Sequence, residues 1–87
     1  YPAQIENVLV SHPAVKEAGV CGIEDPIWGQ VPIAFIVLKQ QITEDELIDF
    51  CKARLAAYKL PKQIHFVNEL PRSGSNKLLR RKLKAML

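Results

Sequence analysis

An almost unbroken apolar run at residues 31–38 is the feature of this chain that most constrains its fold. The run is rich in β-branched and aromatic side chains, and its length is typical of a strand rather than a helix. A strand without a polar face is a central strand that is covered on both sides. Pro32 is compatible with this interpretation because it stands near the start of the run. The run therefore predicts a small sheet with helices packed over it.

Two helices are predicted from the spacing of apolar residues and from signals at their ends. The first begins at Pro2, a residue that suits the first turn of a helix, and it ends before Pro13. The second begins at Thr43, because Thr43 followed three residues later by Glu46 forms a capping box. This helix is expected to continue to the segment 58–61. Its expected buried stripe consists of Leu47, Ile48, Cys51 and Leu55.

Two further strands and a third helix complete the predicted order of elements. Residues 15–23 and 63–67 have the composition of strands, and residues 68–76 are rich in turn-forming side chains. The last helix is expected to begin near Lys77. Its expected apolar face consists of Leu79, Leu83, Met86 and Leu87. The order predicts one α+β domain over residues 1–87, with a three-stranded sheet flanked by about three helices.

A chain of 87 residues is short for a self-contained enzyme. A domain of this size buries roughly 60–65% of its unfolded surface, which leaves little room for a deep active site. The chain also begins at Tyr1 rather than at a methionine, so we expect a module of a larger protein. Cys21 and Cys51 form neither a CxxC pair nor a zinc pattern, and we expect buried thiols in the reducing cytoplasm. No apolar run approaches the ~20 residues of a transmembrane helix.

The net charge of +3 conceals a strong asymmetry along the chain. Residues 1–58 carry four basic and eight acidic side chains, which is a net charge of −4. Residues 59–87 carry eight basic side chains and one acidic side chain, which is a net charge of +7. A basic segment of this kind predicts an anionic partner, such as phosphate groups, nucleic acid or an acidic protein surface.

The segment 71–80 contains the residues best suited to chemistry. Gly74, two serines and Asn76 predict a mobile loop that ends with Lys77 at the start of the last helix. The helix dipole makes a lysine there unfavourable by roughly a few tenths of a kcal/mol, which favours a role other than helix stability. A flexible arm with a point charge is suited to stabilising negative charge that develops on a phosphate or carboxylate. The alternative is an ordinary solvated lysine, and the spacing excludes a phosphate-binding P-loop.

Four stretches of the chain are similar, in the same order, to motifs of one enzyme superfamily. They are YPAQIE (1–6), HPAV through GIED (12–25), WGQVPIAFIV (28–37), and YKLPK (58–62) together with LPR and KLLR (70–80). On these residues the chain resembles, over essentially its whole length, the C-terminal domain of the adenylate-forming superfamily. That superfamily includes acyl- and aryl-CoA synthetases, firefly luciferase and nonribosomal peptide synthetase adenylation domains. Asn76 replaces the usual glycine of the family, but asparagine tolerates the same left-handed backbone, and its presence in some aryl-CoA ligases favours that branch.

The resemblance implies a two-step reaction by a larger acid–CoA ligase, of which this chain is the mobile C-terminal lid domain. In the first step a carboxylate attacks the α-phosphate of ATP, with Mg²⁺, and gives an acyl-adenylate and pyrophosphate. The family's lysine at the position of Lys77 contacts the adenylate in that step. The domain then rotates, and the thiol of CoA attacks the adenylate. The AMP-binding N-terminal domain and the hinge are expected before Tyr1, and the chain alone is expected to be inactive.

For CoA, the resemblance points to the basic corner formed by Tyr58, Lys59 and Lys62. The two lysines are expected to contact the nucleotide phosphates, and Tyr58 is expected to stack on the adenine. The alternative is a helix end with lysines that its dipole favours. Trp28 is a weaker candidate, because a loop tryptophan more often packs than binds a ligand. No metal ligands are expected in this chain.

Three other functions remain open. The chain is compatible with an adenylation domain that serves a carrier-protein thiol, and with a stand-alone module that regulates a synthetase. It is also compatible with nucleic-acid binding through residues 80–84, although no aromatic side chain is interleaved there, and phosphates of ATP and CoA are the preferred partners. His12 and His65 are expected to be structural. Arg72 and Arg80 are expected either to pair with acids of the N-terminal domain or to lie on a solvated face.

Overall fold

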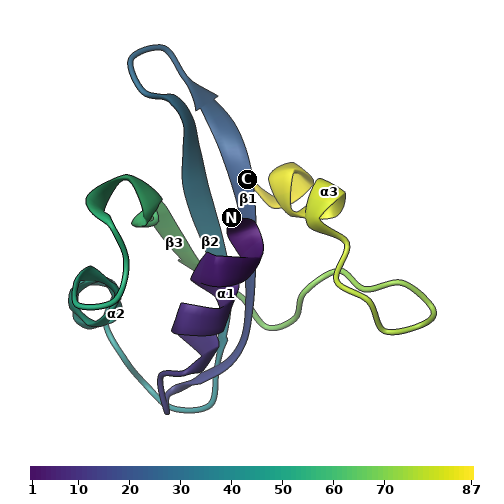
Figure 1. The fold of residues 1–87 in the computed structure, drawn as a ribbon. Coiled ribbons are helices and arrows are strands. Elements are labelled where there is room, and N and C mark those ends of the chain that lie inside the picture. Colours follow the sequence, from purple (N-terminus) through teal and green to yellow (C-terminus); the bar gives the residue numbers. More distant parts are fainter.

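The computed structural model describes all 87 residues and has a three-stranded mixed sheet at its centre (Figure 1). β1 (Val15–Asp25) and β2 (Gly29–Leu38) pair as a long antiparallel hairpin. β3 (Gln63–Phe66) lies parallel to β2 on its other edge, so the strand order is β1-β2-β3. The prediction that the apolar run forms the central strand is confirmed, and residues 31–37 of β2 are all buried.

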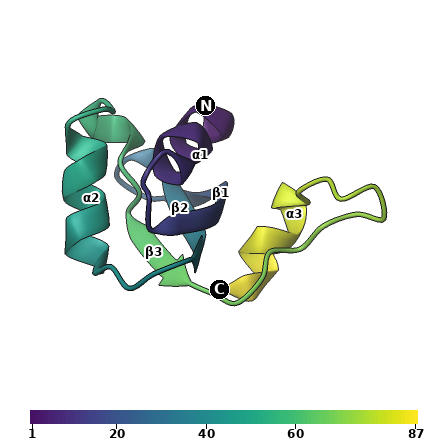
Figure 2. The same cartoon turned by 90° about the horizontal axis from the view of Figure 1, so that it is seen from below.

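Two helices cover one face of the sheet and a third covers the other face (Figure 2). α1 (Pro2–Val10) and α2 (Glu44–Lys52) pack on the first face, and α3 (Arg80–Leu83) packs on the second. A short 3-10 helix, η1 (Ala57–Lys59), follows α2, and another, η2 (Lys84–Met86), follows α3. The predicted order of elements and the α+β class are therefore confirmed.

The two faces of β2 form two separate hydrophobic cores, because successive side chains of a strand point to opposite sides. Residues 34 and 36 lie in a larger core of 11 buried residues, together with side chains of α1 and α2. Residues 33, 35 and 37 lie in a smaller core of 6 buried residues that includes Leu70 and Leu83. Both faces of β2 are covered, and this explains why the run is apolar throughout instead of alternating.

The predicted starts of α1 and α2 are confirmed. Pro2 lies in the first turn of α1, where its missing N–H would have had no helical partner. At the start of α2, the Thr43 hydroxyl oxygen accepts a hydrogen bond from the Glu46 backbone N–H at 3.1 Å. The same hydroxyl donates to the Glu46 carboxylate at 3.0 Å. These two bonds satisfy one of the free N–H groups of the first turn and orient the glutamate side chain beside it.

The expected end of α2 is wrong, since the helix stops at Lys52, well before the segment 58–61. After α2 the chain turns so that Leu55 is buried in the larger core. The Lys62 backbone N–H then donates to the Pro32 carbonyl oxygen at 2.8 Å, which brings the chain back to β2. A longer α2 would hold this segment away from the sheet, so tertiary packing overrides the helical pattern.

The expected helix from Lys77 is also wrong, because α3 begins only at Arg80. The chain before α3 reverses at Asn76, whose φ of 65° is left-handed and does not continue into a right-handed helix. The remaining helix is too short to bury the whole expected apolar face. Within that expected face, Leu83 is fully buried and Leu79 is half-buried. Met86 and Leu87 are exposed.

Gly19 of β1 lies directly against Leu83 of α3. A Cβ atom at this position would lie 3.1 Å from Cδ1 of Leu83 and 3.4 Å from Cδ1 of Leu70. Since 3.1 Å is shorter than an ordinary van der Waals contact, a larger residue here would push α3 outward. The absence of a side chain at Gly19 therefore lets the smaller core close.

Both cysteines are free and buried, in agreement with the expectation. Cys51 lies in the larger core and Cys21 in the smaller one. Burial raises the pKa of both thiols, because a thiolate loses its hydration inside the protein. The helices of this fold all lack the length and the apolar character that crossing a membrane requires.

Candidate functional site

Lys77 lies on a hairpin at residues 70–79 that projects from the body of the domain (Figures 1 and 2). The two arms of this hairpin are joined by an antiparallel bridge between Arg72 and Leu78. The Ser73 backbone N–H also donates to the Lys77 carbonyl oxygen at 2.8 Å. The Lys77 side chain is exposed and makes no hydrogen bond or ion pair with the rest of the domain.

The tip of the hairpin is a tight turn of small polar residues. The Asn76 backbone N–H donates to the Ser73 carbonyl oxygen at 2.9 Å, and the Lys77 backbone N–H donates to the Ser73 hydroxyl at 3.2 Å. Asn76 adopts the left-handed backbone, so the expectation that asparagine supports this loop in place of glycine is confirmed. Lys77 therefore stands on a hydrogen-bonded turn, and no helix dipole opposes its charge.

Arg72 and Arg80 each pair with an acid of this chain. Nη2 of Arg72 lies 2.7 Å from Oε1 of Glu17, and Nη2 of Arg80 lies 2.5 Å from Oε1 of Glu6. The first pair joins the hairpin to β1, and the second joins the start of α3 to α1. Both arginine side chains stay partly exposed, at 32% and 44%, and their expected pairing with acids of the N-terminal domain stays a prediction.

Glu6 of α1 joins three parts of the fold and is absent from the expected site residues. Its Oε2 accepts hydrogen bonds from the Val20 backbone N–H and from Nε of Arg80, both at 2.9 Å. The hydrogen bond to this carboxylate raises the pKa of the Arg80 guanidinium further above its usual range. The signal in the sequence is an acid placed beside Ile5 and three residues before Leu9, on the apolar side of the helix.

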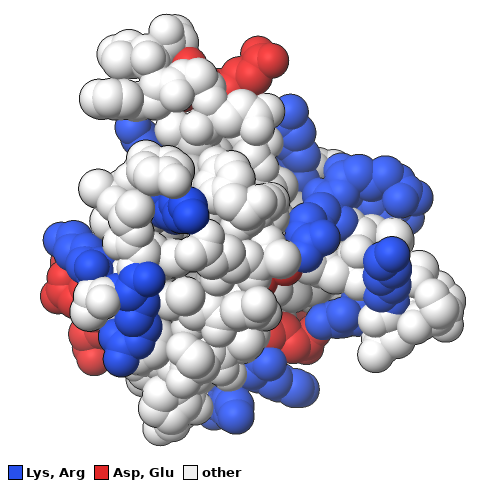
Figure 3. All heavy atoms as spheres, viewed as in Figure 1, with Lys and Arg blue, Asp and Glu red and all other residues white.

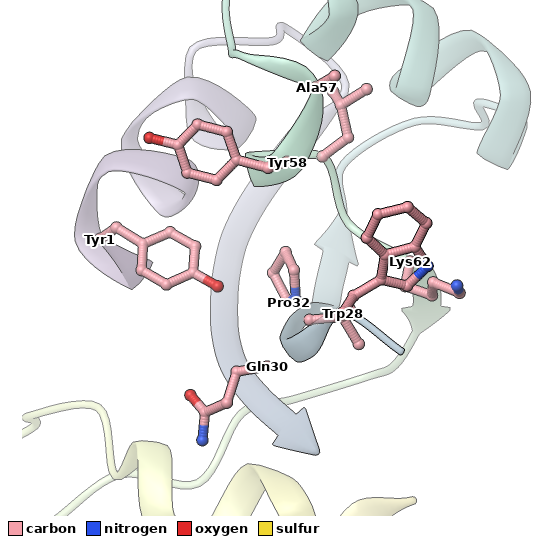
Figure 4. A pocket seen from close by; sticks show the side chains of 9 residues that line it. Tyr1, Trp28, Gln30, Pro32, Ala57, Tyr58 and Lys62 are labelled. Atoms are coloured by element: carbon pink, nitrogen blue, oxygen red, sulfur yellow. The ribbon is translucent and has the colours of Figure 1, made fainter. Parts of the chain in front are cut away.

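A hollow of about 590 Å³ brings together three of the four residues expected to bind CoA (Figure 4). Trp28 comes from the turn between β1 and β2, Tyr58 from η1, and Lys62 from the segment before β3. We call this hollow the aromatic groove. Its remaining lining residues are Tyr1, Gln30, Val31, Pro32, Ala57 and Leu60.

The side chains around the aromatic groove are unusually exposed for their size. Trp28 and Tyr58 have exposed fractions of 71% and 74%, and Tyr1 has 49%. In Figure 4 the two tyrosine rings lie on one side of Pro32, and Trp28 and Lys62 lie on the other side. The groove thus offers flat apolar faces with a cation at its edge, which suits a planar ring that carries phosphate groups.

Lys59 does not line the aromatic groove, unlike the other residues of the expected CoA corner. Its Nζ donates to Oε1 of Gln4 on α1 at 2.6 Å and lies 5.5 Å from the ring centre of Tyr58. The side chain of Lys59 therefore links η1 to α1 in this structure.

The turn that carries Trp28 is held by Asp25. Oδ1 of Asp25 accepts hydrogen bonds from the backbone N–H groups of Ile27 and Trp28, both at 2.9 Å. The bond from Trp28 and then the bond from Ile27 lower the pKa of the Asp25 carboxyl, because they stabilise its charged form. Gly29 completes the turn with a φ of 82°. Trp28 is thus presented on a structured turn although its ring is exposed.

The basic side chains of the last third gather over α3 and the hairpin of Lys77. Figure 3 shows this as a blue region on the right, whereas the blue groups near α2 on the left are interleaved with red acidic ones. The basic residues of these elements are Arg72 and Lys77 on the hairpin, Arg80, Arg81 and Lys82 on α3, and Lys84 on η2. The excess positive charge of the last third thus lies on the same side of the domain as the hairpin of Lys77.

The two histidines have partners inside the domain. Nδ1 of His12 accepts a hydrogen bond from the Ala14 backbone N–H at 3.0 Å, and its ring meets Phe50 edge-on. The His65 ring stacks on Phe35 with ring centres 5.1 Å apart. Neither lies in the aromatic groove or on the hairpin of Lys77. The structure contains no cluster of three or more His, Cys, Asp or Glu side chains that could hold a metal ion.

Curated relatives cover the whole of this chain. The 2-succinylbenzoate–CoA ligase of Bacillus cytotoxicus is 60% identical over 87 residues, which are 100% of this chain and 18% of the ligase. The chain thus spans less than a fifth of the length of that relative.

Solved structures of o-succinylbenzoate CoA synthetase from Bacillus subtilis have the same fold over almost the whole chain. A double mutant bound with its product analogue OSB-NCoA aligns with a TM-score of 0.95 and 56% identity, over 98% of this chain and 18% of that one. The complex with the acyl-adenylate intermediate OSB-AMP has a TM-score of 0.94 and 56% identity, over 97% and 17%. The complex with ATP and magnesium has a TM-score of 0.91 and 55% identity, over 97% and 17%.

Most of the chain also matches the model of one protein family. The model described as the AMP-binding enzyme C-terminal domain matches residues 4–77, which include the hairpin up to Lys77 and every lining residue of the aromatic groove except Tyr1. This model covers most of the chain. The relatives named above are similar to the chain in sequence and in fold. The chain therefore belongs to the family of AMP-binding enzyme C-terminal domains.

Proposed function

We propose that this chain is the C-terminal domain of an AMP-forming acid–CoA ligase and that the acid is 2-succinylbenzoate. The proposal is supported by the family match and by 60% identity to a 2-succinylbenzoate–CoA ligase over the whole chain. Because the chain spans 18% of that ligase, we propose that the AMP-binding domain, the hinge and the acid-selecting residues belong to the rest of the protein. The proposed substrates are the acid, ATP with Mg²⁺, and CoA. We propose a cytoplasmic location because ATP and CoA are supplied there.

The observation that carries the proposal is the exposed ammonium group of Lys77 on a structured hairpin. In the first step, a carboxylate oxygen of the acid attacks the α-phosphorus of ATP, and pyrophosphate leaves. Negative charge is then concentrated on oxygens that Nζ of Lys77 is proposed to contact. An ammonium without a partner in its own domain has no ion pair to break before it makes that contact. Its contribution is electrostatic stabilisation and correct positioning of the reacting groups.

The aromatic groove is proposed to hold the nucleotide end of CoA in the second step. Tyr58 and Trp28 offer exposed rings for the adenine, and Lys62 offers a cation for its phosphates. Lys59 keeps a part in this proposal only if it releases Gln4, with which it pairs in this structure. A carrier-protein thiol is the alternative acceptor, but CoA is favoured because the relative from Bacillus subtilis binds the product analogue OSB-NCoA.

The groove and Lys77 are proposed to act in turn, by rotation of this domain against the AMP-binding domain. Figure 1 shows the hairpin on the far right, whereas the turn between β1 and β2 lies at the top and η1 on the left. No residue of the hairpin lines the groove. One orientation of the domain is therefore proposed to deliver Lys77 for adenylation, and another to deliver the groove for thioester formation.

The test uses the full-length protein with Lys77→Ala. We expect adenylation of 2-succinylbenzoate, measured by pyrophosphate exchange, to fall by about 10²–10³, the usual cost of losing one preorganised charge contact. Thioester formation from supplied acyl-adenylate and CoA is expected to continue near the wild-type rate, because Lys77 has left the site in that step.

Lys82→Ala is the matched control, because Lys82 is an exposed lysine of the same basic region. It is expected to leave both half-reactions unchanged. If Lys77→Ala kept wild-type adenylation, the role proposed for Lys77 would be wrong. If the wild-type enzyme adenylated benzoate or a fatty acid as well as 2-succinylbenzoate, the proposed substrate would be wrong instead.

A further inference from the structure

The Arg72 side chain connects the hairpin of Lys77 to the sheet in two directions. Its Nε and Nη2 atoms donate to Oε1 of Glu17 on β1, at 3.2 and 2.7 Å. Its Nη1 donates to the carbonyl oxygen of Asn76 at 3.2 Å. This carbonyl belongs to the peptide group that joins Asn76 to Lys77. One guanidinium thus links a fixed strand to the peptide bond directly before the proposed catalytic lysine.

Glu17 lies directly after an irregularity in the pairing of β1 with β2. The pairing register between β1 and β2 shifts between Val15 and Glu17, so the strand carries a bulge at this point. A bulge redirects side chains relative to a regular strand and is frequent beside functional sites. The exposed fractions of the Arg72 and Glu17 side chains are 32% and 26%, which makes the pair partly shielded from water. The bulge in β1 and the partly shielded ion pair thus lie next to each other, where the hairpin meets the sheet.

The direction of the Lys77 side chain depends on how the peptide group between Asn76 and Lys77 is held. This peptide group makes two hydrogen bonds: its carbonyl accepts from Nη1 of Arg72, and its N–H donates to the Ser73 hydroxyl. Rotation of the peptide group after Asn76 would swing the whole Lys77 side chain. A small displacement of a contacting group is costly in catalysis, about 10²-fold for roughly 1 Å.

We infer that Arg72, anchored by Glu17, is a positioning residue that orients Lys77 for adenylation. The inference rests on the proposed function of Lys77. The planar fork of arginine is essential to it, because the guanidinium donates to a carboxylate and to a carbonyl in different directions at the same time. A lysine at this position keeps the charge but not the fork.

The test measures both half-reactions of the full-length enzyme carrying Arg72→Ala, Arg72→Lys or Glu17→Gln. We expect the kcat of adenylation to fall by about ten- to a hundredfold in Arg72→Ala, with the KM values for ATP and the acid changed by less than about twofold. Arg72→Lys is expected to recover little of the loss, and Glu17→Gln to lose about as much as Arg72→Lys. Thioester formation from supplied acyl-adenylate is expected to be unchanged in all three.

The decisive experiment measures adenylation by the double variant that carries both Arg72→Ala and Lys77→Ala. If Arg72 acts through Lys77, the second substitution adds no further loss of adenylation. An equal further loss in the double variant would overturn the inference and assign Arg72 a role of its own. Arg81→Ala is the control, because Arg81 is exposed and forms no ion pair in the structure.

The outcomes separate this inference from the proposed function. Wild-type adenylation in Lys77→Ala contradicts the role of Lys77 itself. A loss in Lys77→Ala without a loss in Arg72→Ala contradicts only the positioning role. If Arg72→Ala fails to fold, as judged by circular dichroism, Glu17→Gln decides the question, because it removes the charge of the anchor and keeps its shape.

Discussion

Asp25 shows how a single exposed side chain shapes the surface that we propose for CoA. Its carboxylate holds the turn that carries Trp28 by accepting two backbone N–H groups. Aspartate is common in such turns because its short side chain reaches the backbone two residues further on. The exposed tryptophan is therefore kept in place by a residue that does not itself line the groove.

The lowered pKa of Asp25 makes this turn sensitive to acid. The folded pKa lies below the unfolded one, so the stabilisation of the turn is complete above the unfolded pKa and is lost as the pH falls through the folded pKa. We expect the amide resonances of Trp28 and Ile27 to titrate with a midpoint below the ordinary range of an aspartate. Asp25→Asn should abolish this titration. A midpoint within or above the ordinary range would contradict the arrangement.

At the scale of elements, the buried Glu6 carboxylate explains how α3 stays attached to the domain. α3 has only four residues and ends a loop, so its own helical hydrogen bonds contribute little. It is held by Leu83 in the smaller core and by Arg80 on Glu6. Glu6 also accepts a hydrogen bond from the backbone of β1, so α1, β1 and α3 meet at one carboxylate.

Glu6→Ala is expected to lower the free energy of unfolding by about 1–3 kcal/mol, the usual cost of leaving charged or buried partners unsatisfied. Arg80→Ala is expected to cost less, because the Val20 N–H still bonds Glu6 and the Arg80 side chain is 44% exposed. Urea denaturation followed by circular dichroism measures both. Asp49→Ala is the control, since the ion pair of Asp49 with Lys52 is exposed and expected to contribute at most about 0.5 kcal/mol. Equal losses in Glu6→Ala and Asp49→Ala would refute the junction.

At the scale of the whole molecule, the two proposed sites lie on two separate surfaces. The hairpin of Lys77 stands on one side, and the aromatic groove lies between η1, the β1–β2 turn and the start of α1 (Figures 1 and 4). A domain with two such surfaces needs no deep cavity of its own if it presents each surface to another part of the protein. This arrangement is consistent with a chain that spans 18% of the length of the related ligase from Bacillus cytotoxicus.

The division predicts that groove variants affect only one half-reaction. In the full-length enzyme, Tyr58→Ala is expected to raise the KM for CoA at least fivefold, because stacking of a base on an aromatic ring contributes about 1–3 kcal/mol. Adenylation, measured by pyrophosphate exchange, is expected to be unchanged. Tyr58→Phe is the matched control, since it keeps the ring and should keep the KM. Equal loss in both half-reactions would mean that the groove has another role.

Much of the fold was predictable because its signals are local. The apolar run of β2, the capping pair of Thr43 and Glu46, and the prolines beside α1 each act within a few residues. Their effects do not depend on where the rest of the chain lies. The left-handed backbone at Asn76 was expected from the family's glycine at this position, and asparagine is one of the few other residues that tolerate it. Lys77 and its exposed loop were therefore accessible from the sequence as a candidate site.

Other features were decided only by tertiary structure, because they join residues that are distant in the chain. Glu6 and Arg80 are 74 positions apart, and Glu17 and Arg72 are 55 positions apart, so no periodicity connects them. The aromatic groove draws its walls from three separate segments, and Lys59 leaves it for Gln4 because α1 happens to lie beside η1. The sequence thus determined the strands, the helix starts and the exposed lysine through local sterics and hydrogen bonding. Packing of the helices on the sheet decided where α2 ends, which acids hold the arginines and which side chains surround the groove.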